Sequence, residues 1–215
     1  MAKLKYYLNI LLLAIAAGMS ISLGGAVYLT STNKVLGAFL FSVGLCTILV
    51  FKFKLFTGVV GYIPNNKPVY IIEVVITWIG NLIGTFGFAT LMRFTRISEK
   101  LNESAVSSTD TKLADGPVSL IILGIFCGLL MFIAVDTYKK YIDTKPFNAV
   151  FMEVMCVTVF ILAGFEHSIA DMYYFAAAGR YLESFYVLGF VTLGNAIGGM
   201  LIPLINKISG ALTKN

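Results

Sequence analysis

Six apolar segments, each long enough to cross a bilayer, constrain the fold of this chain more than any other feature of its sequence. They cover approximately residues 7–30, 35–52, 69–92, 117–138, 147–165 and 184–206. A transmembrane helix needs about 20 predominantly apolar residues. Only 13% of the residues are charged, which is about half the share in a soluble domain. The sequence therefore predicts an all-α integral membrane protein with six transmembrane helices.

We expect residues 1–215 to form one transmembrane domain. Its halves cover about 7–92 and 117–206, and a polar external loop rich in Ser, Thr and Asp joins them at about 93–116. Basic residues are slightly more numerous in the loops that lie inside if both termini are cytoplasmic, which favours that orientation in a cell membrane. The net charge of +5 comes from these loop ends. No basic patch interleaved with aromatic residues suggests a nucleic-acid partner.

Polar residues interrupt the second and fifth spans, so both of these helices are expected to be broken. The second runs into Lys54-Leu55-Phe56-Thr57-Gly58 and the fifth into Gly164-Phe165-Glu166-His167-Ser168. An ionisable residue at mid-membrane depth costs about 2.5–3.5 kcal/mol. Non-helical backbone at that depth is tolerated only inside protein or beside a water-filled cavity. Two interrupted spans in corresponding places therefore point to a transport site.

The two halves of the chain resemble each other. Ala17-Gly18 precedes Cys127-Gly128 by 110 residues, and Thr57 precedes His167 by the same interval. Because three spans are an odd number, the second copy must insert upside down, which predicts a 3+3 inverted repeat. Gly80-Asn81-Leu82-Ile83-Gly84 and Gly194-Asn195-Ala196-Ile197-Gly198 carry small residues four apart, which let helices approach closely.

Several polar residues have alternative interpretations. Asn81 and Asn195 can satisfy backbone groups freed at the breaks, or each can simply bond a neighbouring helix. Thr57 can cap the half-helix that follows the first break, and Ser168 or Asp171 can cap the one after the second. An isolated histidine such as His167, the only one in the chain, is in most cases a structural residue. Glu73 and Glu153 lie near span starts and are expected at membrane interfaces.

Five segments taken together resemble the formate/nitrite transporter family, and the resemblance extends from about residue 10 to 206. They are Phe41-Ser42-Val43-Gly44-Leu45, Leu55-Phe56-Thr57-Gly58, Gly80-Asn81-Leu82-Ile83-Gly84, Gly164-Phe165-Glu166-His167-Ser168-Ile169-Ala170-Asp171-Met172, and Gly194-Asn195-Ala196-Ile197-Gly198-Gly199. The resemblance implies a fold similar to the aquaporins, in homopentamers with one pore per protomer. It also implies passage of small monovalent anions or their conjugate acids, such as formate, nitrite, hydrosulfide and in some cases lactate.

The same resemblance assigns site residues. The family's central histidine falls on His167, its loop threonine on Thr57, and its outer-mouth lysine on Lys112. Its two hydrophobic constrictions fall on Phe41, Leu45, Phe56 and Phe160, with Leu55 beside them. Two positions depart from the family pattern. Lys54 stands where an acidic residue is usual, and Gly128 stands where the fourth span usually carries Asn, so we expect one polar partner to be missing from the pore wall.

The chemistry of these residues suggests a mechanism. Desolvation of charge makes a bare anion far costlier than a neutral acid inside an apolar ring. Lys112 draws the anion into the vestibule, and Thr57 and His167 offer hydrogen bonds between the constrictions. With a reference pKa near ~6.5, a histidine can donate a proton to the anion, or it can hold the anion by a charge-assisted bond. Glu166 is expected to orient the loop by accepting backbone N–H bonds.

Other functions remain as alternatives. A neutral-solute channel for water, glycerol or urea has a similar fold, but such a channel does not explain the lone histidine, His167. A proton-coupled anion symporter fits the same residues as a channel. A non-transporting membrane subunit that anchors partner enzymes needs no polar breaks. We expect no enzyme, no cofactor and no metal site, because the chain carries no catalytic triad, phosphate loop or cluster of metal ligands.

Overall fold

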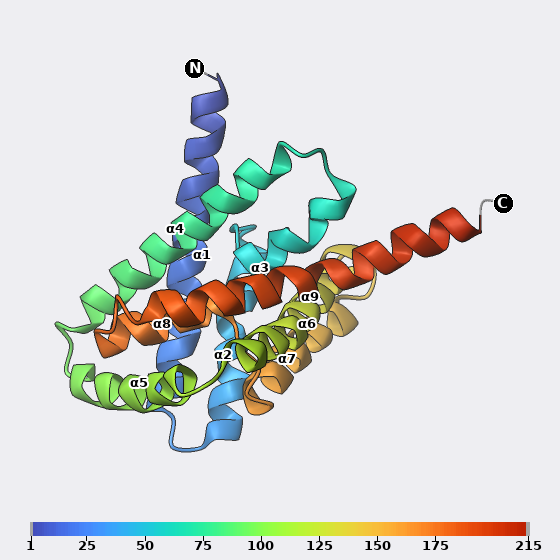
Figure 1. Cartoon of the computed structure of the whole chain (residues 1–215). Helices are drawn as coiled ribbons and strands as arrows, with labels where there is room; N and C mark the ends of the chain where they lie inside the picture. Colours follow the sequence, from blue (N-terminus) through green and yellow to red (C-terminus); the bar gives the residue numbers. More distant parts are fainter. Residues whose placement is uncertain (1, 214–215) are drawn as a thin grey trace.

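Helices make up almost all of the part of the chain that the structure describes, residues 2–213 of a computed structural model. Residues 1 and 214–215 of the predicted single domain lie outside this range. Figure 1 shows the helices packed in one bundle, from which the start of α1 and the end of α9 project. Over the described residues the fold has no strand, which confirms the predicted all-α class.

Four helices are long and apolar enough to cross a membrane, and they match four predicted spans. They are α1 (Ala2–Thr30), α4 (Tyr70–Met92), α6 (Pro117–Tyr141) and α9 (Ser184–Leu212). The predicted starts of α4, α6 and α9 are right to within one residue, whereas α1 begins earlier and α9 ends later than the apolar pattern indicates. Polar helical turns beyond the apolar stretch account for both differences, because hydropathy does not report them.

The second and fifth spans are both broken. The shorter apolar helices α2 (Lys34–Val50) and α7 (Pro146–Leu162) stop partway. After α2 come the four-residue α3 (Phe56–Val59) and the 3₁₀ helix η1 (Val60–Asn65), whereas after α7 comes the longer α8 (Ser168–Ala178). Pro64 in η1 and Pro68 beyond it prevent a regular helix from continuing after the first break, so the two half-helices differ in length.

Glycines bring α1 against α4 and α6 against α9 in the same way. A Cβ on Gly18 would lie 2.3 Å from the backbone oxygen of Asn81, and a Cβ on Gly128 would lie 2.3 Å from that of Asn195. The second pair of contacts repeats the first 110 to 114 residues later, as a repeat of the two halves predicts. Gly128 therefore packs against α9 and does not line a pore wall, so our expectation that it removes a polar partner from such a wall is corrected.

The helices α2 and α7 pack side by side in opposite directions. Phe41 contacts Phe160 edge to face with ring centroids 6.1 Å apart, and Cys46 donates to the Glu153 carboxylate over 2.7 Å. From the first contact to the second, the residue number rises on α2 and falls on α7, so the two helices are antiparallel. Each break thus lies at the opposite end of this pair from the other.

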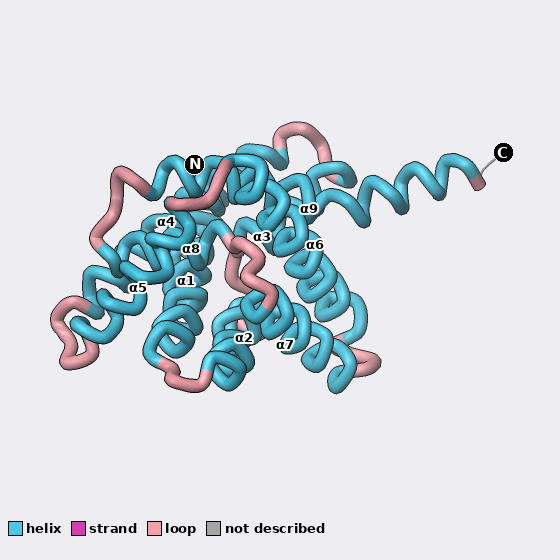
Figure 2. The backbone as a smooth tube through the Cα atoms, turned by 60° about the horizontal axis from the view of Figure 1, so that its bottom comes forward, coloured by secondary structure: helices cyan, strands magenta, loops and turns pink. Residues whose placement is uncertain are grey.

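The segment 93–116 contains a helix, α5 (Ser98–Leu113), where the sequence predicts a polar loop. Its buried residues Leu101, Ala105 and Thr109 are four residues apart and form one helical face, which packs on α8. A stripe this narrow in an otherwise polar segment does not resemble a membrane span, and for that reason hydropathy did not indicate a helix. Figure 2 shows α5 beside α8.

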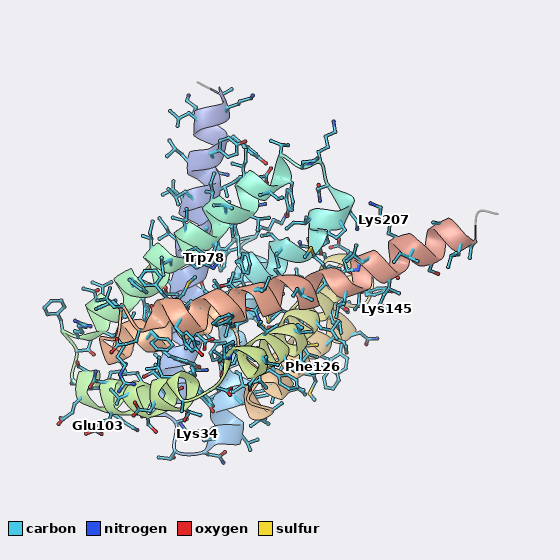
Figure 3. All side chains as sticks on the ribbon, viewed as in Figure 1. Lys34, Trp78, Glu103, Phe126, Lys145 and Lys207 are labelled. Atoms are coloured by element: carbon cyan, nitrogen blue, oxygen red, sulfur yellow. The ribbon has the colours of Figure 1, made fainter. Side chains whose placement is uncertain are left out.

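The two halves also make contact through polar side chains. Trp78 on α4 donates its indole N–H to the hydroxyl of Thr192 on α9 over 3.2 Å, and Figure 3 shows Trp78 on the ribbon of α4. Beyond this contact the last turns of α9, residues 204–212, are exposed and extend away from the bundle (Figure 2).

Candidate functional site

Both breaks begin with the same kind of helix end. Lys52 has a φ of 56° and Gly164 a φ of 71°, so each ends its helix in the left-handed conformation. The next residue then donates its N–H five residues back: Phe53 to the Ile48 oxygen and Phe165 to the Phe160 oxygen, both over 2.9 Å. This is the pattern of the glycine-terminated helix end. A lysine at the first break adopts a conformation that costs about 1 kcal/mol more than it does for glycine.

Asn81 and Asn195 bridge the two breaks. Asn81 accepts from the Phe56 N–H over 2.8 Å and donates to the Lys54 oxygen over 2.9 Å and to the Ala14 oxygen over 2.8 Å. Asn195 accepts from Ser168 over 2.9 Å and donates to the oxygens of Glu166 over 2.8 Å and Gly124 over 2.9 Å. Each amide thus satisfies two backbone groups at a break and bonds one carbonyl of a neighbouring helix, α1 for Asn81 and α6 for Asn195. Both roles that the sequence left open are therefore observed.

These bonds correct the alignment of the two halves. Because Asn81 bonds Phe56 where Asn195 bonds Ser168, the breaks are 112 residues apart. Leu55 is then the counterpart of His167, and each is the residue just before its half-helix. The predicted correspondence of Thr57 with His167 is wrong by two residues, because the spacing of the glycine pairs does not hold through the loops.

Thr57 and His167 meet at the centre. The Thr57 hydroxyl oxygen lies 3.0 Å from Nε2 of His167, and both side chains are buried. Nδ1 of His167 accepts the N–H of Ala170 over 3.1 Å, so the neutral ring carries its hydrogen on Nε2 and donates to Thr57. His167 therefore caps α8, a role that the sequence had offered to Ser168 or Asp171. The Thr57 hydroxyl keeps its own hydrogen free to donate.

Apolar side chains enclose this pair. The Phe160 ring stacks on the His167 ring with centroids 5.6 Å apart and contacts the Phe41 ring edge to face. All five residues predicted as constrictions are buried: Phe41, Leu45, Leu55, Phe56 and Phe160. They belong to one hydrophobic cluster, and Phe160 places this cluster directly against the His167 ring.

A basic cavity of about 440 Å³ opens at the first break. Lys52, Lys54 and Lys139 line it together with Leu55, and Asp143 is the only acidic residue among its lining residues. Lys54, the departure from the family pattern, therefore adds positive charge to this mouth. The cavity lies at the C-terminal end of α2.

A second cavity, of about 270 Å³, opens at the second break, beside the C-terminal end of α7. His167, Lys112, Glu166 and Asp171 line it. Since α2 and α7 are antiparallel, the two cavities lie at opposite ends of that helix pair, and they share no lining residue. Each predicted polar break thus opens on its own cavity, with the Thr57–His167 pair joining the two breaks.

Lys112 lies inside the second cavity, near the end of α5. Its ammonium binds the Glu166 carboxylate and lies 2.9 Å from Oδ1 of Asp171. Burial alone lowers the pKa of Lys112, but Asp171 and then Glu166 outweigh that effect and raise its pKa above the usual value, so the ammonium stays charged. The Glu166 carboxylate therefore binds Lys112 and does not orient the loop by accepting backbone N–H bonds, which corrects our expectation.

Sequence reasoning named two acids, Asp171 and Glu153, but did not predict that both are buried. Asp171 follows His167 by one helical turn and is 1% exposed, and its distance from Lys112 depends on how α5 packs. Glu153 was expected at an interface, but its carboxylate is fully buried between α2 and α7, with Oε1 unpartnered among the described residues. The sequence signal that could have indicated burial of Glu153 is its position seven residues after the start of the apolar helix α7. No described group of His, Cys, Asp or Glu could hold a metal ion.

These features define a multi-pass membrane transport protein in which two broken spans meet at a buried polar pair. The chain belongs to the formate/nitrite transporter family, whose profile matches residues 2–207. The family consists of transporters, in agreement with our expectation that the chain is not an enzyme.

Individual relatives agree with this assignment. The formate channel FocA of Escherichia coli strain K12 is 28% identical over 92% of this chain and 85% of its own length. The nitrite transporter NirC of the same strain is 30% identical over 57% of this chain and 48% of its own length. Among solved structures, a pentameric formate channel with formate bound covers 97% of this chain and 98% of its own, with 25% identity and a TM-score of 0.80.

Proposed function

We propose that this protein conducts small monovalent anions or their conjugate weak acids across a membrane, with formate, nitrite and hydrosulfide as candidate substrates. The observation that carries the proposal is the Thr57–His167 contact of 3.0 Å. It packs against apolar groups and joins two breaks that each open on a cavity. Formate and nitrite also stand in the names of similar proteins. Hydrosulfide is included because it has the same charge and is likewise the anion of a weak acid.

The apolar groups decide the form in which the solute crosses. An anion stripped of water among Phe41, Phe160 and Leu55 loses its hydration, whereas the neutral acid loses far less. We infer that the anion collects in a cavity, takes up a proton near the Thr57–His167 pair and passes onward as the acid. The free Thr57 hydroxyl hydrogen is available to bond the anion.

We infer that His167 assists this protonation transiently. In the neutral ring, Nδ1 is occupied by the Ala170 N–H, so an imidazolium must give up that bond. A nearby anion compensates for the added charge. Transfer then breaks the N–H bond of the imidazolium and forms an O–H bond on a formate or nitrite ion, and the ring returns to neutral. Water in the second cavity, which His167 lines, resupplies the proton.

We propose a homopentamer in the cell membrane with both termini cytoplasmic. The pentamer is supported by the similar solved structure, which is a pentameric formate channel. Large apolar side chains on the outer faces of α2 and α7, among them Phe39, Val43, Phe151 and Met155, are exposed in the single chain, and lipid or a neighbouring protomer is expected to cover them.

Flux into liposomes that contain the purified protein tests the proposal. Formate, nitrite, hydrosulfide and glycerol are offered in parallel between about pH 5 and pH 8. We expect uptake of at least one weak acid, rising as the pH falls, because both the neutral acid and the imidazolium become more abundant. Glycerol should stay at the rate of protein-free liposomes.

Other outcomes identify the alternatives. Glycerol passage without anion uptake would indicate a neutral-solute channel. Uptake against the substrate gradient, driven by an imposed proton gradient, would indicate the proton-coupled symporter. A lack of flux for every solute would contradict transport and favour the anchoring subunit.

A further inference from the structure

The second cavity carries an excess of negative charge. Two carboxylates, from Glu166 and Asp171, face a single ammonium, from Lys112. The other cavity carries the opposite excess, with three lysines and one aspartate among its lining residues. For a protein that admits anions, an acidic mouth is a disadvantage, because like charges repel. The arrangement therefore requires an explanation.

Asp171 is the less satisfied of the two acids. Its Oδ1 is 2.9 Å from the Lys112 ammonium, while its Oδ2 is buried and has no hydrogen-bond partner among the described residues. The residue is 1% exposed and still lines the cavity. An ionised carboxylate with one oxygen unpaired in such a place is costly. A proton on Oδ2 removes that cost and creates an O–H donor.

Among the described residues, Lys112 is the one cation that lines the cavity beside Asp171. Lys112 comes from α5, Glu166 and His167 from the break, Tyr174 from α8 itself and Tyr28 from α1, and all of them line the same cavity. The titratable group that α6 places near Asp171 is the buried thiol of Cys127. Arg93, which follows α4, binds the Ala176 oxygen near the other end of α8. Arg180, which follows α8, pairs with Asp110.

We propose that Asp171 holds an exchangeable proton that sets how readily this cavity admits an anion, an inference that rests on the proposed function. With Asp171 ionised, the cavity is acidic and repels the anion. With Asp171 protonated, Lys112 and Glu166 balance, and the new O–H group on Oδ2 donates a hydrogen bond to the anion. The proton comes from water in the cavity and returns to it, so the site adds a pH dependence that is independent of His167.

The variant Asp171→Asn tests this directly, because asparagine has the same shape without the charge. Its control is Asp110→Asn, which removes one negative charge from the same end of the molecule. The Asp110 side chain is 62% exposed and pairs with Arg180. We expect the Asp171→Asn variant to take up formate about fivefold faster than the wild type at about pH 8. At about pH 5.5 the two proteins should be equal, and Asp110→Asn should follow the wild type throughout.

Infrared difference spectroscopy gives a second readout that needs no flux. As the pH falls, the wild type and Asp110→Asn should show a protonated carboxyl band that Asp171→Asn lacks. Any band from the buried Glu153 is common to all three proteins and cancels in the comparison. Absence of this band from the wild type would overturn the proposal, whether or not anions pass. So would a pH profile of formate uptake that Asp171→Asn leaves unchanged. If the band is present but the wild type shows no uptake of any anion, the proton site stands and the proposed function fails.

Discussion

Replacing Asn195 by leucine should remove most of the stability of the folded protein. Leucine fills a similar volume but leaves the Ser168 N–H and the Glu166 oxygen at the break buried without their partner, and it removes one bond to the Gly124 oxygen of α6. Each unsatisfied buried group costs about 1–3 kcal/mol, so for the two groups at the break a loss of roughly 2–6 kcal/mol is expected. Thermal unfolding in detergent should show a midpoint lower by about 10 °C or more.

The equivalent residue and an exposed one supply the controls. Asn81→Leu should lower the midpoint by a similar amount, because Asn81 makes the equivalent bonds, two at the first break and one to the Ala14 oxygen of α1. Asn206→Leu, also on α9 but exposed, should leave it within error of the wild type. A midpoint for Asn195→Leu equal to that of Asn206→Leu would show that the amide does not hold the break.

Replacing Gly198 by alanine should also destabilise the protein strongly. A Cβ at this position would lie within van der Waals overlap of the backbone oxygen of Ile125, at 1.9 Å. Since a backbone group cannot rotate away as a side chain can, α6 and α9 must separate along this contact. We expect a loss of about 3 kcal/mol or more, at the upper end of the range for overpacking.

Gly189 on the same helix is the matched control, because a Cβ there would meet nothing within 4 Å. Gly189→Ala should be neutral or stabilising by up to about 1 kcal/mol, since alanine is the better helix former. Unfolding midpoints and the yield of monodisperse protein after size-exclusion chromatography measure both variants. Equal behaviour of the two variants would mean that α6 and α9 do not approach as closely as the structure indicates.

The spans and the breaks follow from the sequence because both depend on local composition. A run of apolar residues identifies a membrane helix wherever it packs, and the polar groups of Glu166 and His167 mark the interruption. The sequence shows that backbone groups at the second break need hydrogen-bond partners. It does not show that Asn195, on a helix distant in the sequence, is the residue that supplies them.

The charges around the site depend on packing between segments that are far apart in the sequence. Lys112 lies 54 residues before Glu166, in a helix that the hydropathy pattern does not reveal. Its distance from Asp171 follows only once α5 packs on α8. Glu153 shows the same dependence on packing. Its position near the start of a span predicts a membrane interface, whereas in the structure its carboxylate is bound by Cys46 of α2.

The initial rate of formate uptake by liposomes containing the wild type or His167→Asn, at about pH 6, tests the central claim most directly. Asparagine can still accept the Ala170 N–H as a helix cap, so the half-helix should persist while the titratable ring is lost. We predict fast uptake by the wild type and a reduction of about tenfold or more in the variant, with a weaker dependence on pH. Wild-type uptake and pH dependence in His167→Asn would contradict the account, because the proposed path and its proton transfer both pass through this side chain.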